Sequence, residues 1–499
     1  WLGPLKGNQS TLEQATAYHV LSSESLLGIP IQAFAETVIG FLVFGTALMT
    51  TGAGKFFINL AFALLGHVRG GPAKVAIFAS GLMGSMSGSV ISNVVTTGVM
   101  TIPAMKRAGF SPAYAGGVEA CASTGGVLMP PVMGATAFIM AVFLEVPYLT
   151  IAIAAIIPSM LYFFGLFMQI DAYAASRNLP GLARESLPRV SDIMREGWHF
   201  IAVFVLLTIM LVVLQREVLA PFYATALLIV INQVTPGDRW TWKSVKDFII
   251  ATGNLLAEIT AILAGVGLIV GALSVTGMAG TFVNDLVFMA GGNTLILLLM
   301  GALTSFILGI GMTVTAAYIF LAIVLAPALI KGGLDPLSVH MFIFYWGMVS
   351  YITPPVALGA YAAAAIAGAN PMRTGLEAMR LGSIIYFIPF FFVLNTAFIL
   401  RAPVPDILLL TVSALLGITM VAGALQGYLV GVGHLTTDPR IGWVVRGLIL
   451  IGGLFLATPS GGPITLTDLE MMLAAIALIG PGIILARWIN HKAGIETTA

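Results

Sequence analysis

The chain has 499 residues, of which 59% are hydrophobic and only 9% are charged, and its net charge is +1 at neutral pH. Soluble domains carry about 25% charged residues, so the composition excludes an ordinary soluble protein and gives no reason to expect nucleic acid as a partner. Apolar runs of about 20 residues recur from end to end, which predicts an all-α polytopic membrane protein. The single cysteine, Cys121, excludes an intrachain disulfide.

The first half of the chain alternates apolar segments with short charged turns. Residues 1–28 are mixed and polar and are expected to lie at the membrane interface, and because the chain opens at Trp1 we expect further residues upstream. The elements predicted next are a span at 29–51, an in-plane amphipathic helix at 55–68, a span from residue 74 into a polar break, a helix at 112–128, an apolar piece at 132–144 and a span at 149–170.

The second half continues this alternation. Two loops rich in lysine and arginine, 171–197 and 238–247, are separated by two predicted spans, so both are expected on the cytoplasmic side. Trp240 and Trp242 favour an interfacial helix in the second loop. The predicted spans and breaks of this half are spans at 198–214, 218–233, 259–275 and 294–308, a polar break at 309–315, a helix that ends at Thr353-Pro354-Pro355, a small-residue helix at 356–368, and spans at 382–400, 407–425, 444–457 and 471–485.

Two polar, glycine-rich stretches interrupt the apolar sequence, SMSGSVISNVVTTG at 85–98 and GIGMTVT at 309–315. Backbone groups of such a break at membrane depth must face protein or a water-filled cavity. Paired Gly/Pro-interrupted segments in two halves of a membrane protein indicate the binding site of a secondary transporter. Matched residues recur around the two breaks at a constant spacing of 224 positions: Pro103 and Pro327, Arg107 and Lys331, Gly109 and Gly333, Pro112 and Pro336, Pro130 and Pro354, and Pro131 and Pro355.

Each break is predicted to form the tip of a re-entrant hairpin. A helix N-terminus exposed there offers unpaired N–H groups and about half a positive charge, which suits a carboxylate. Unwound carbonyls and the oxygens of Ser, Thr and Asn suit a hard cation such as Na⁺. Two tips that meet would therefore form one anion site flanked by two cation sites.

The chain around the first break reads SGSVISNVVTTGVMTIPAMKRAGFSPAYAGGVEACASTGGVLMPPVMGATAFIMA at residues 87–141. This stretch resembles the large membrane subunit of TRAP transporters, and it is closest to the TAXI-type branch, whose membrane subunits are usually fused. Residues 70–76 and 309–382 agree with the same family. The resemblance covers about residues 28–400.

The resemblance implies an ion-transporter-superfamily elevator fold with two inverted repeats, two re-entrant helical hairpins and horizontal arm helices. It implies cation-gradient-driven uptake of a small organic acid, such as a dicarboxylate, across the bacterial inner membrane, and not an enzyme. A periplasmic binding protein would deliver the substrate, and a small membrane subunit or a fused region before residue 29 would complete the assembly. Na⁺ or H⁺ would drive transport without a cofactor, a nucleotide or a transition metal.

On this basis the chain divides into functional regions. They are an interfacial segment (1–28), a scaffold span with an arm helix (29–73), the first half of a transport domain (74–170), a cytoplasmic loop with scaffold spans and an arm helix (171–250), the second half of the transport domain (251–381), and C-terminal scaffold spans (382–499).

The resemblance also assigns candidate site residues, although close helix packing is an alternative role for the small ones. Glu119, within an apolar helix, is either a proton carrier or the acceptor of a structural hydrogen bond. The expected substrate contacts are Ser87, Gly88, Ser89, Thr124, Gly311, Met312 and Thr313. The expected cation ligands are Ser87, Asn93, Gly126, Gly309, Thr313, Thr315 and Thr353.

Three other functions are possible for a chain of this composition. A channel would have polar breaks but would not need paired hairpins with proline pairs. An intramembrane enzyme would need a nucleophile–base pair or a metal cluster at membrane depth, and the sequence offers neither pattern. An anion/cation symporter of related hairpin fold would work without a binding protein.

Overall fold

The computed structural model describes residues 8, 10–235, 239–435, 437–438, 441–461 and 466–493. In this part of the chain the regular structure is helical except for a short ribbon, β1 (Tyr428–Leu429) with β2 (Gly433–His434). Six of its helices are long and apolar enough to cross a membrane, or seven if a pair bent by 66° near Gly382 counts as one span. The predicted all-α polytopic membrane protein is therefore confirmed at this level. Parts of the predicted regions 1–28, 238–247 and 382–499 lie outside the described residues.

The first half of the chain contains helices of very different lengths. They are α1 (Leu12–Leu21), α2 (Ile29–Ala33), α3 (Ile39–Thr50), α4 (Ala53–Leu65), α5 (Gly71–Ser87), α6 (Val90–Arg107), α7 (Pro112–Leu128), α8 (Ala135–Phe143), α9 (Tyr148–Ala154), α10 (Ile156–Ser176), α11 (Val190–Val212) and α12 (Ala220–Val234). A π-helical turn, Phe34–Val38, joins α2 to α3.

The second half has the same character. Its helices are α13 (Trp242–Thr276), α14 (Met278–Met289), α15 (Thr294–Gly309), α16 (Val314–Val324), α17 (Ala326–Lys331), α18 (Pro336–Val349), α19 (Leu358–Ala367), α20 (Pro371–Leu381), α21 (Ile388–Leu394), α22 (Val404–Gln426), α23 (Gly442–Ala457) and α24 (Asp468–Lys492). Short 3-10 turns lie at Arg184–Ser186, Ser383–Tyr386 and Thr396–Ile399.

Both predicted polar breaks are present as interruptions between helices. In the first break α5 ends at Ser87 and α6 begins at Val90, because Gly88 takes the left-handed conformation and Ser89 caps the new helix. In the second break α15 ends at Gly309 and α16 begins at Val314. The helix predicted at 112–128 is α7, with the same bounds.

Two predictions for the middle of the chain are wrong. The interfacial helix near Trp242 and the span at 259–275 are one continuous helix, α13, of 35 residues. No proline interrupts it, and Gly253 is exposed with open space around it, so nothing there ends the helix. The charged loop predicted at 171–197 is also shorter, because α10 continues to Ser176 and α11 begins at Val190. Helix α14 was not predicted.

The span predicted at 382–400 is also wrong, because this segment breaks into three pieces. A 3-10 turn precedes α21, in which Pro389 occupies the first turn, where its missing N–H costs nothing. Asn395 then adopts an extended conformation, and its side chain accepts a hydrogen bond from the N–H of Ala397. The side-chain cap therefore competes with continuation of the helix.

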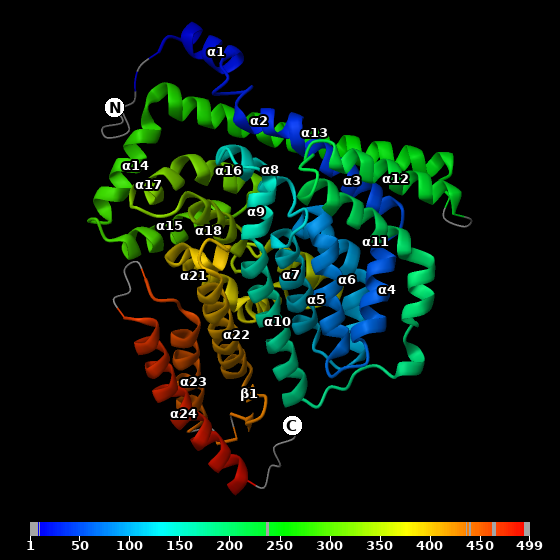
Figure 1. The fold of residues 1–499 in the computed structure, drawn as a ribbon, viewed down its shortest axis with the longest axis vertical. Coiled ribbons are helices and arrows are strands. Elements are labelled where there is room, and N and C mark those ends of the chain that lie inside the picture. The colour runs from blue at the N-terminus through cyan, green and yellow to red at the C-terminus, as the bar shows by residue number, and fades with distance from the viewer. Residues whose placement is uncertain are drawn as a thin grey trace.

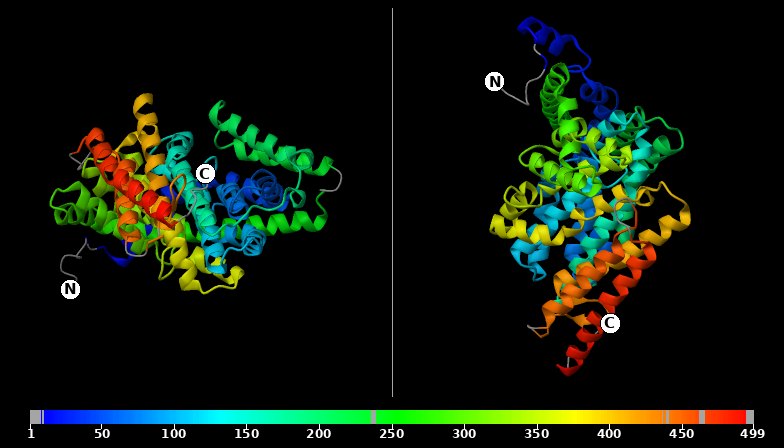
Figure 2. Two further views of the ribbon diagram at one scale, coloured as in Figure 1. Left: turned by 90° about the horizontal axis from the view of Figure 1, so that it is seen from below. Right: turned by 90° about the vertical axis from the view of Figure 1, so that its left-hand side faces the viewer.

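Two helical groups lie at opposite ends of the molecule. Helix α13 runs along one end with α1, α2 and α3 against it, and the C-terminal helices α22, α23 and α24 form the other end (Figure 1). The right-hand view of Figure 2 shows the same separation. Helix α22 packs on α10, and α24 packs on α23. The hairpin-bearing helices α5–α8 and α15–α19 lie between these ends.

The helix starts around the two breaks use the same turn chemistry at the predicted 224-residue spacing. Ser89 caps α6 and Thr313 caps α16, each accepting a hydrogen bond from a backbone N–H of the first turn. Ser111 and Asp335 cap α7 and α18 in the same way, and each of these helices begins with a proline. Such caps fix where a helix begins, so the recurrence sets equivalent helix ends in both halves.

Left-handed residues recur at the same spacing. Gly109 and Gly333 have φ values of 95° and 90°, and Met133 and Ala357 have φ values of 58° and 35°. Met133 and Ala357 each follow a proline pair that contains a cis peptide bond. A non-glycine residue is uncommon in this conformation, which makes its appearance at two equivalent positions informative.

A buried ion cluster joins the start of α5 to the end of α10. Asp171 accepts hydrogen bonds from Lys74, whose Nζ lies 2.6 Å from Oδ1, and from Arg69, whose Nη2 lies 2.5 Å from Oδ2. Lys74 is only 4% exposed, and its Nζ lies 4.4 Å from the ring centroid of Phe167. The cluster compensates a cation that the fold has removed from solvent.

We expect Asp171→Ala to lower the free energy of unfolding by about 3 kcal/mol or more, because Lys74 would remain buried without its partner. The loss can be measured by titrating SDS into detergent-solubilised protein. Arg401→Ala is a suitable control, since Arg401 is largely exposed where it pairs with Asp335 at 3.0 Å and should contribute less than about 1 kcal/mol. Equal losses in the two variants would contradict the expectation.

Candidate functional site

The first break packs directly against the start of α8. A Cβ atom placed on Gly88 would lie 2.6 Å from the Cα atom of Gly134, so the two backbones touch where both residues are glycine. Gly88 ends α5, and Gly134 is the N-cap position of α8. The contact therefore brings the N-terminus of α6 next to the N-terminus of α8.

Two further contacts extend this arrangement across the two halves of the chain. A Cβ atom on Gly359, in the first turn of α19, would lie 3.0 Å from Cγ1 of Val90, the first residue of α6. The hydroxyl oxygens of Thr136 in α8 and Thr315 in α16 lie 2.9 Å apart. The N-termini of α19, α6, α8 and α16 are thus neighbours in that order, two from each half.

Convergent helix N-termini create a site for negative charge. Each N-terminus carries about half a positive charge on N–H groups that have no partner within the helix. In α19 the N–H groups of Gly359 and Ala360 donate to the carbonyl oxygen of Tyr351, so the open donors are mainly those of α6, α8 and α16. The residues that begin these four helices include no lysine, arginine or other charged side chain. Attraction for an anion would therefore come from the backbone, and a carboxylate is a suitable ligand.

Carbonyl-bearing helix ends lie beside the first break. A Cβ atom on Gly126, near the end of α7, would lie 2.6 Å from the carbonyl oxygen of Ser80 and 2.7 Å from the Cα atom of Gly84 in α5. Asn93 is 1% exposed, and its Nδ2 donates a 2.7 Å hydrogen bond to the same Ser80 carbonyl. Its Oδ1 is buried without a protein partner. Asn93 is the fourth residue of α6, and its unpartnered amide oxygen, beside the hairpin helix α5, is a suitable ligand for a hard cation.

The second break has a corresponding pair of helix ends, α15 and α18. Ser350 donates a 2.9 Å hydrogen bond to the carbonyl oxygen of Gly309, and a Cβ atom on Gly309 would lie 2.5 Å from the carbonyl oxygen of Gly347. Ser350 stands 224 positions after Gly126. Both breaks therefore bring the C-terminus of a hairpin helix against the C-terminus of a helix that ends at a proline pair.

The other predicted site residues divide by what their polar groups contact. Thr124 donates to the carbonyl oxygen of Ala120 in its own helix, so its hydroxyl is used locally. Thr353 donates to the carbonyl oxygen of Val349 and lies 2.6 Å from the hydroxyl of Tyr386. Both hydroxyls are therefore used in hydrogen bonds with other protein groups, and the carbonyl oxygen of Thr353 accepts a hydrogen bond from Ala357, the residue before α19.

The tip residues have different surroundings. The hydroxyl of Ser87 donates to the carbonyl oxygen of Ser89 at 3.4 Å, a long and therefore weak hydrogen bond. Gly311 is exposed in a left-handed turn, and Thr313 is exposed as the cap of α16. The carbonyl oxygen of Met312 accepts a 3.3 Å hydrogen bond from the Tyr351 hydroxyl. The second tip is thus more open than the first.

Glu119 is the centre of a buried hydroxyl cluster within α5, α6 and α7. Its Oε1 accepts hydrogen bonds from Ser80 at 2.7 Å, Thr97 at 2.5 Å and Ser123 at 3.2 Å. Its Oε2 accepts one from Thr101 at 2.5 Å. Four donors compensate the buried carboxylate, which ties the first hairpin to α7.

Tyrosines hold the two proline breaks in place. The Tyr148 hydroxyl lies 2.6 Å from the carbonyl oxygen of Pro131, and the Tyr361 hydroxyl lies 2.6 Å from that of Pro355. The carbonyl groups freed after each helix therefore have partners; the one at Pro131 is partly buried, whereas the one at Pro355 is exposed.

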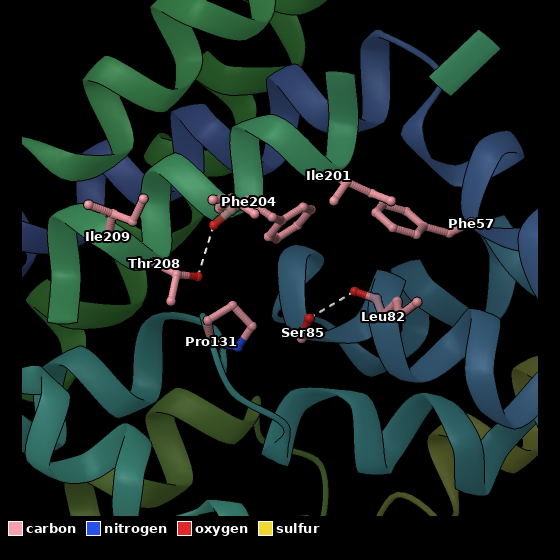
Figure 3. A pocket seen from close by; sticks show the side chains of 9 residues that line it. Phe57, Leu82, Ser85, Pro131, Ile201, Phe204, Thr208 and Ile209 are labelled. Atoms are coloured by element: carbon pink, nitrogen blue, oxygen red, sulfur yellow. Dashed lines mark hydrogen bonds between the residues drawn. The ribbon is translucent and has the colours of Figure 1, made fainter. Parts of the chain in front are cut away.

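An apolar cavity of about 410 Å³ lies beside the first hairpin, between α5, α4 and α11 (Figure 3). Its two hydroxyl-bearing residues form hydrogen bonds within their own helices: Thr208 donates to Phe204, and Ser85 donates to Leu82. Pro131 and Phe57 add apolar surface. The cavity offers no free hydrogen-bonding side chain, so the convergent helix N-termini are the better candidate for an organic acid.

Sequence reasoning missed several residues that take part in these contacts, among them Ser350, Thr136 and Tyr351. Ser350 could have been found from its 224-residue relation to Gly126. Thr136 follows the first proline pair by a few residues, and Tyr351 precedes the second, but no motif indicates that they cross to Thr315 or Met312.

Comparisons with known proteins identify the family. Residues 4–407 match the family described as the tripartite ATP-independent periplasmic transporter, DctM component. The C4-dicarboxylate TRAP transporter large permease protein DctM of Pseudomonas aeruginosa is 26% identical over 372 residues, which cover 72% of this chain and 84% of that protein. The sialic acid TRAP transporter large permease protein SiaM of Vibrio cholerae is 24% identical over 394 residues, covering 77% and 88%.

A third relative, the 2,3-diketo-L-gulonate TRAP transporter large permease protein YiaN of Escherichia coli K12, is 22% identical over 347 residues, covering 67% of this chain and 76% of that protein. The family match spans both breaks and all four convergent helix N-termini. Its members are transporter permeases and not enzymes. The chain therefore belongs to the DctM component family of tripartite ATP-independent periplasmic (TRAP) transporters, as a large permease subunit.

Proposed function

We propose that this permease takes up a small organic acid, driven by a cation gradient, across the bacterial inner membrane. The observation that carries the proposal is the meeting of the N-termini of α6, α8, α16 and α19, which suits a carboxylate without any charged side chain. Three of the similar permeases are named for a C4-dicarboxylate, sialic acid and 2,3-diketo-L-gulonate, which are carboxylic acids, and another is named for isethionate, a sulfonate.

The coupling cation would bind beside the anion, at the carbonyl ends of the hairpin helices. In the first half, the free Oδ1 of Asn93 and the backbone around Gly126 would supply oxygens. In the second half, the helix ends at Gly309 and Ser350 would do so. A cation next to the carboxylate would neutralise it, which makes binding of the two mutually favourable.

Movement of the hairpin-bearing helices as one body would carry the site across the membrane. Helix α19 packs on α6 and α7, and α16 packs on α8, so the two halves interlock through each other's hairpins. Helices α3 and α11 pack on α12, and α13 packs on α3, α2 and α16; we assign α3, α11, α12 and α13 to the stationary part. This arrangement supports an elevator with two inverted repeats.

A periplasmic binding protein of the TAXI type, together with a small membrane subunit or a fused equivalent, would complete the transporter. The family is described as tripartite, which supports partners of this kind. The rival is a symporter of related fold that needs no binding protein.

We expect uptake of radiolabelled dicarboxylates into proteoliposomes to require both the binding protein and an inward gradient of Na⁺ or H⁺. Each gradient should be imposed separately, and saturable counterflow should distinguish a carrier from a channel. Uptake that proceeds equally well without the binding protein would favour the rival symporter. Flux without saturation or counterflow would overturn the proposal.

We expect Asn93→Ala to raise the half-saturating concentration of the coupling cation by about tenfold, because a cation would lose one oxygen ligand. The measurement is initial uptake against external cation concentration. Asn232→Ala provides a control, since Asn232 is an equally buried amide on α12. An unchanged cation dependence in Asn93→Ala would remove this residue from the proposed cation site.

We propose Glu119 as the group that couples transport to protons, because its hydroxyl partners connect it to Asn93. The Thr97 hydroxyl lies 2.5 Å from Oε1 of Glu119 and 2.8 Å from the carbonyl oxygen of Asn93, so its one hydrogen can be given to either acceptor. Uptake by the unaltered protein should then rise as the external pH falls, and Glu119→Gln should flatten this dependence. Glu258→Gln, which changes an exposed acid on α13, should keep it. Full pH dependence in Glu119→Gln would assign Glu119 a purely structural role.

A further inference from the structure

We propose that Thr136 is a positioning residue of the anion site, and that it acts by orienting the hydroxyl of Thr315 toward a carboxylate of the transported acid. The inference rests on the proposed function and deepens it, because it moves Thr315 from the cation ligands to the anion contacts. It also gives a role to Thr136, which no sequence motif assigned.

The two threonines stand at matching positions, at the starts of their helices. Each occupies the second residue of its helix, Thr136 in α8 and Thr315 in α16. Both lie where a helix N-terminus presents unpaired N–H groups and partial positive charge. A cation would be repelled at this place, whereas a carboxylate would be attracted, so the pair belongs with the anion.

The hydroxyls of the two threonines form a hydrogen bond with each other. Buried threonines inside other helices donate to a carbonyl four residues back, as Thr46 does to Leu42 and Thr225 does to Pro221. The hydrogen bond between Thr136 and Thr315 instead spans 179 positions and joins the two halves. Because it forms at the helix starts, it fixes the spacing of two N-termini, and within the described part of the chain no other side-chain hydrogen bond joins them.

The two hydroxyls differ in which one donates and which one accepts. In a pair of hydroxyls, one donates and the other accepts, and the accepting hydroxyl keeps its own hydrogen for another partner. Thr136 is 2% exposed, whereas Thr315 is partly exposed, so a ligand reaches Thr315 first. Thr136 then donates to Thr315, and Thr315 donates to the carboxylate. A valine at position 136 keeps the shape but removes this orientation.

The test measures the half-saturating concentrations of substrate and cation separately, in proteoliposome counterflow with a panel of radiolabelled dicarboxylates. We expect Thr136→Val to raise the value for the acid by about tenfold and to leave the value for the cation within about twofold. Thr136→Ser should keep the half-saturating substrate concentration of the unaltered protein, because serine retains the hydroxyl. Thr225→Val, at a buried threonine bonded within α12, should change neither.

A double-mutant comparison makes the test independent of how well one variant folds. Thr315→Val should raise the substrate value at least as much as Thr136→Val, because it removes the donor itself, and the double variant should be no worse than Thr315→Val, since Thr136 acts only through Thr315. Additive losses, an unchanged substrate value, or equal shifts for substrate and cation would overturn the inference. If the unaltered protein transports none of the acids, the proposed function fails and this inference fails with it.

Discussion

The fold depends on the requirement that every helix end inside a membrane has a partner. Backbone groups in hydrocarbon cannot turn to water, so a chain that interrupts its helices must bring the interruptions together or line a cavity with them. Here the contact of Gly88 with Gly134 allows two interrupted helices to approach at backbone distance. A side chain at either glycine would separate the N-termini of α6 and α8, and the anion site would lose half of its backbone donors.

The two halves of the chain have the same helix caps and left-handed residues at equivalent positions, but their buried polar groups differ. The caps and left-handed residues recur at the 224-residue spacing, because these positions determine where helices start and stop. The polar cores are not equivalent. The first half has the Glu119 hydroxyl cluster, whereas the second has a buried hydrogen bond of 2.6 Å between the Tyr318 hydroxyl and Nδ1 of His340. Equivalent backbones can thus support different chemistry on either side of one site.

The sequence was most informative where local chemistry decides structure. Proline at the start of α7 and the serine before it set the beginning of that helix, and the polar break after Ser87 was equally clear. Sequence reasoning failed where competing local signals were balanced, as in the continuous α13 and in the broken segment around Asn395.

The candidate site was predictable only in part, for a physical reason. Hydroxyls, amides and glycines at the breaks stand out because they are costly within apolar sequence. Their partners do not stand out, because the contact of Thr136 with Thr315 and that of Val90 with Gly359 join residues far apart in the chain. Only the packing of one half on the other creates these contacts.

The absence of charged side chains from the first turns of the four convergent helices has an electrical consequence. A binding site that uses lysine or arginine carries a fixed charge when it is vacant, and transferring that charge through a low-dielectric region is costly. Helix dipoles attract an anion but add no formal charge. The four convergent helix starts of a vacant carrier of this kind therefore add no formal charge to be moved, and a monoanion bound there with one monovalent cation adds none either.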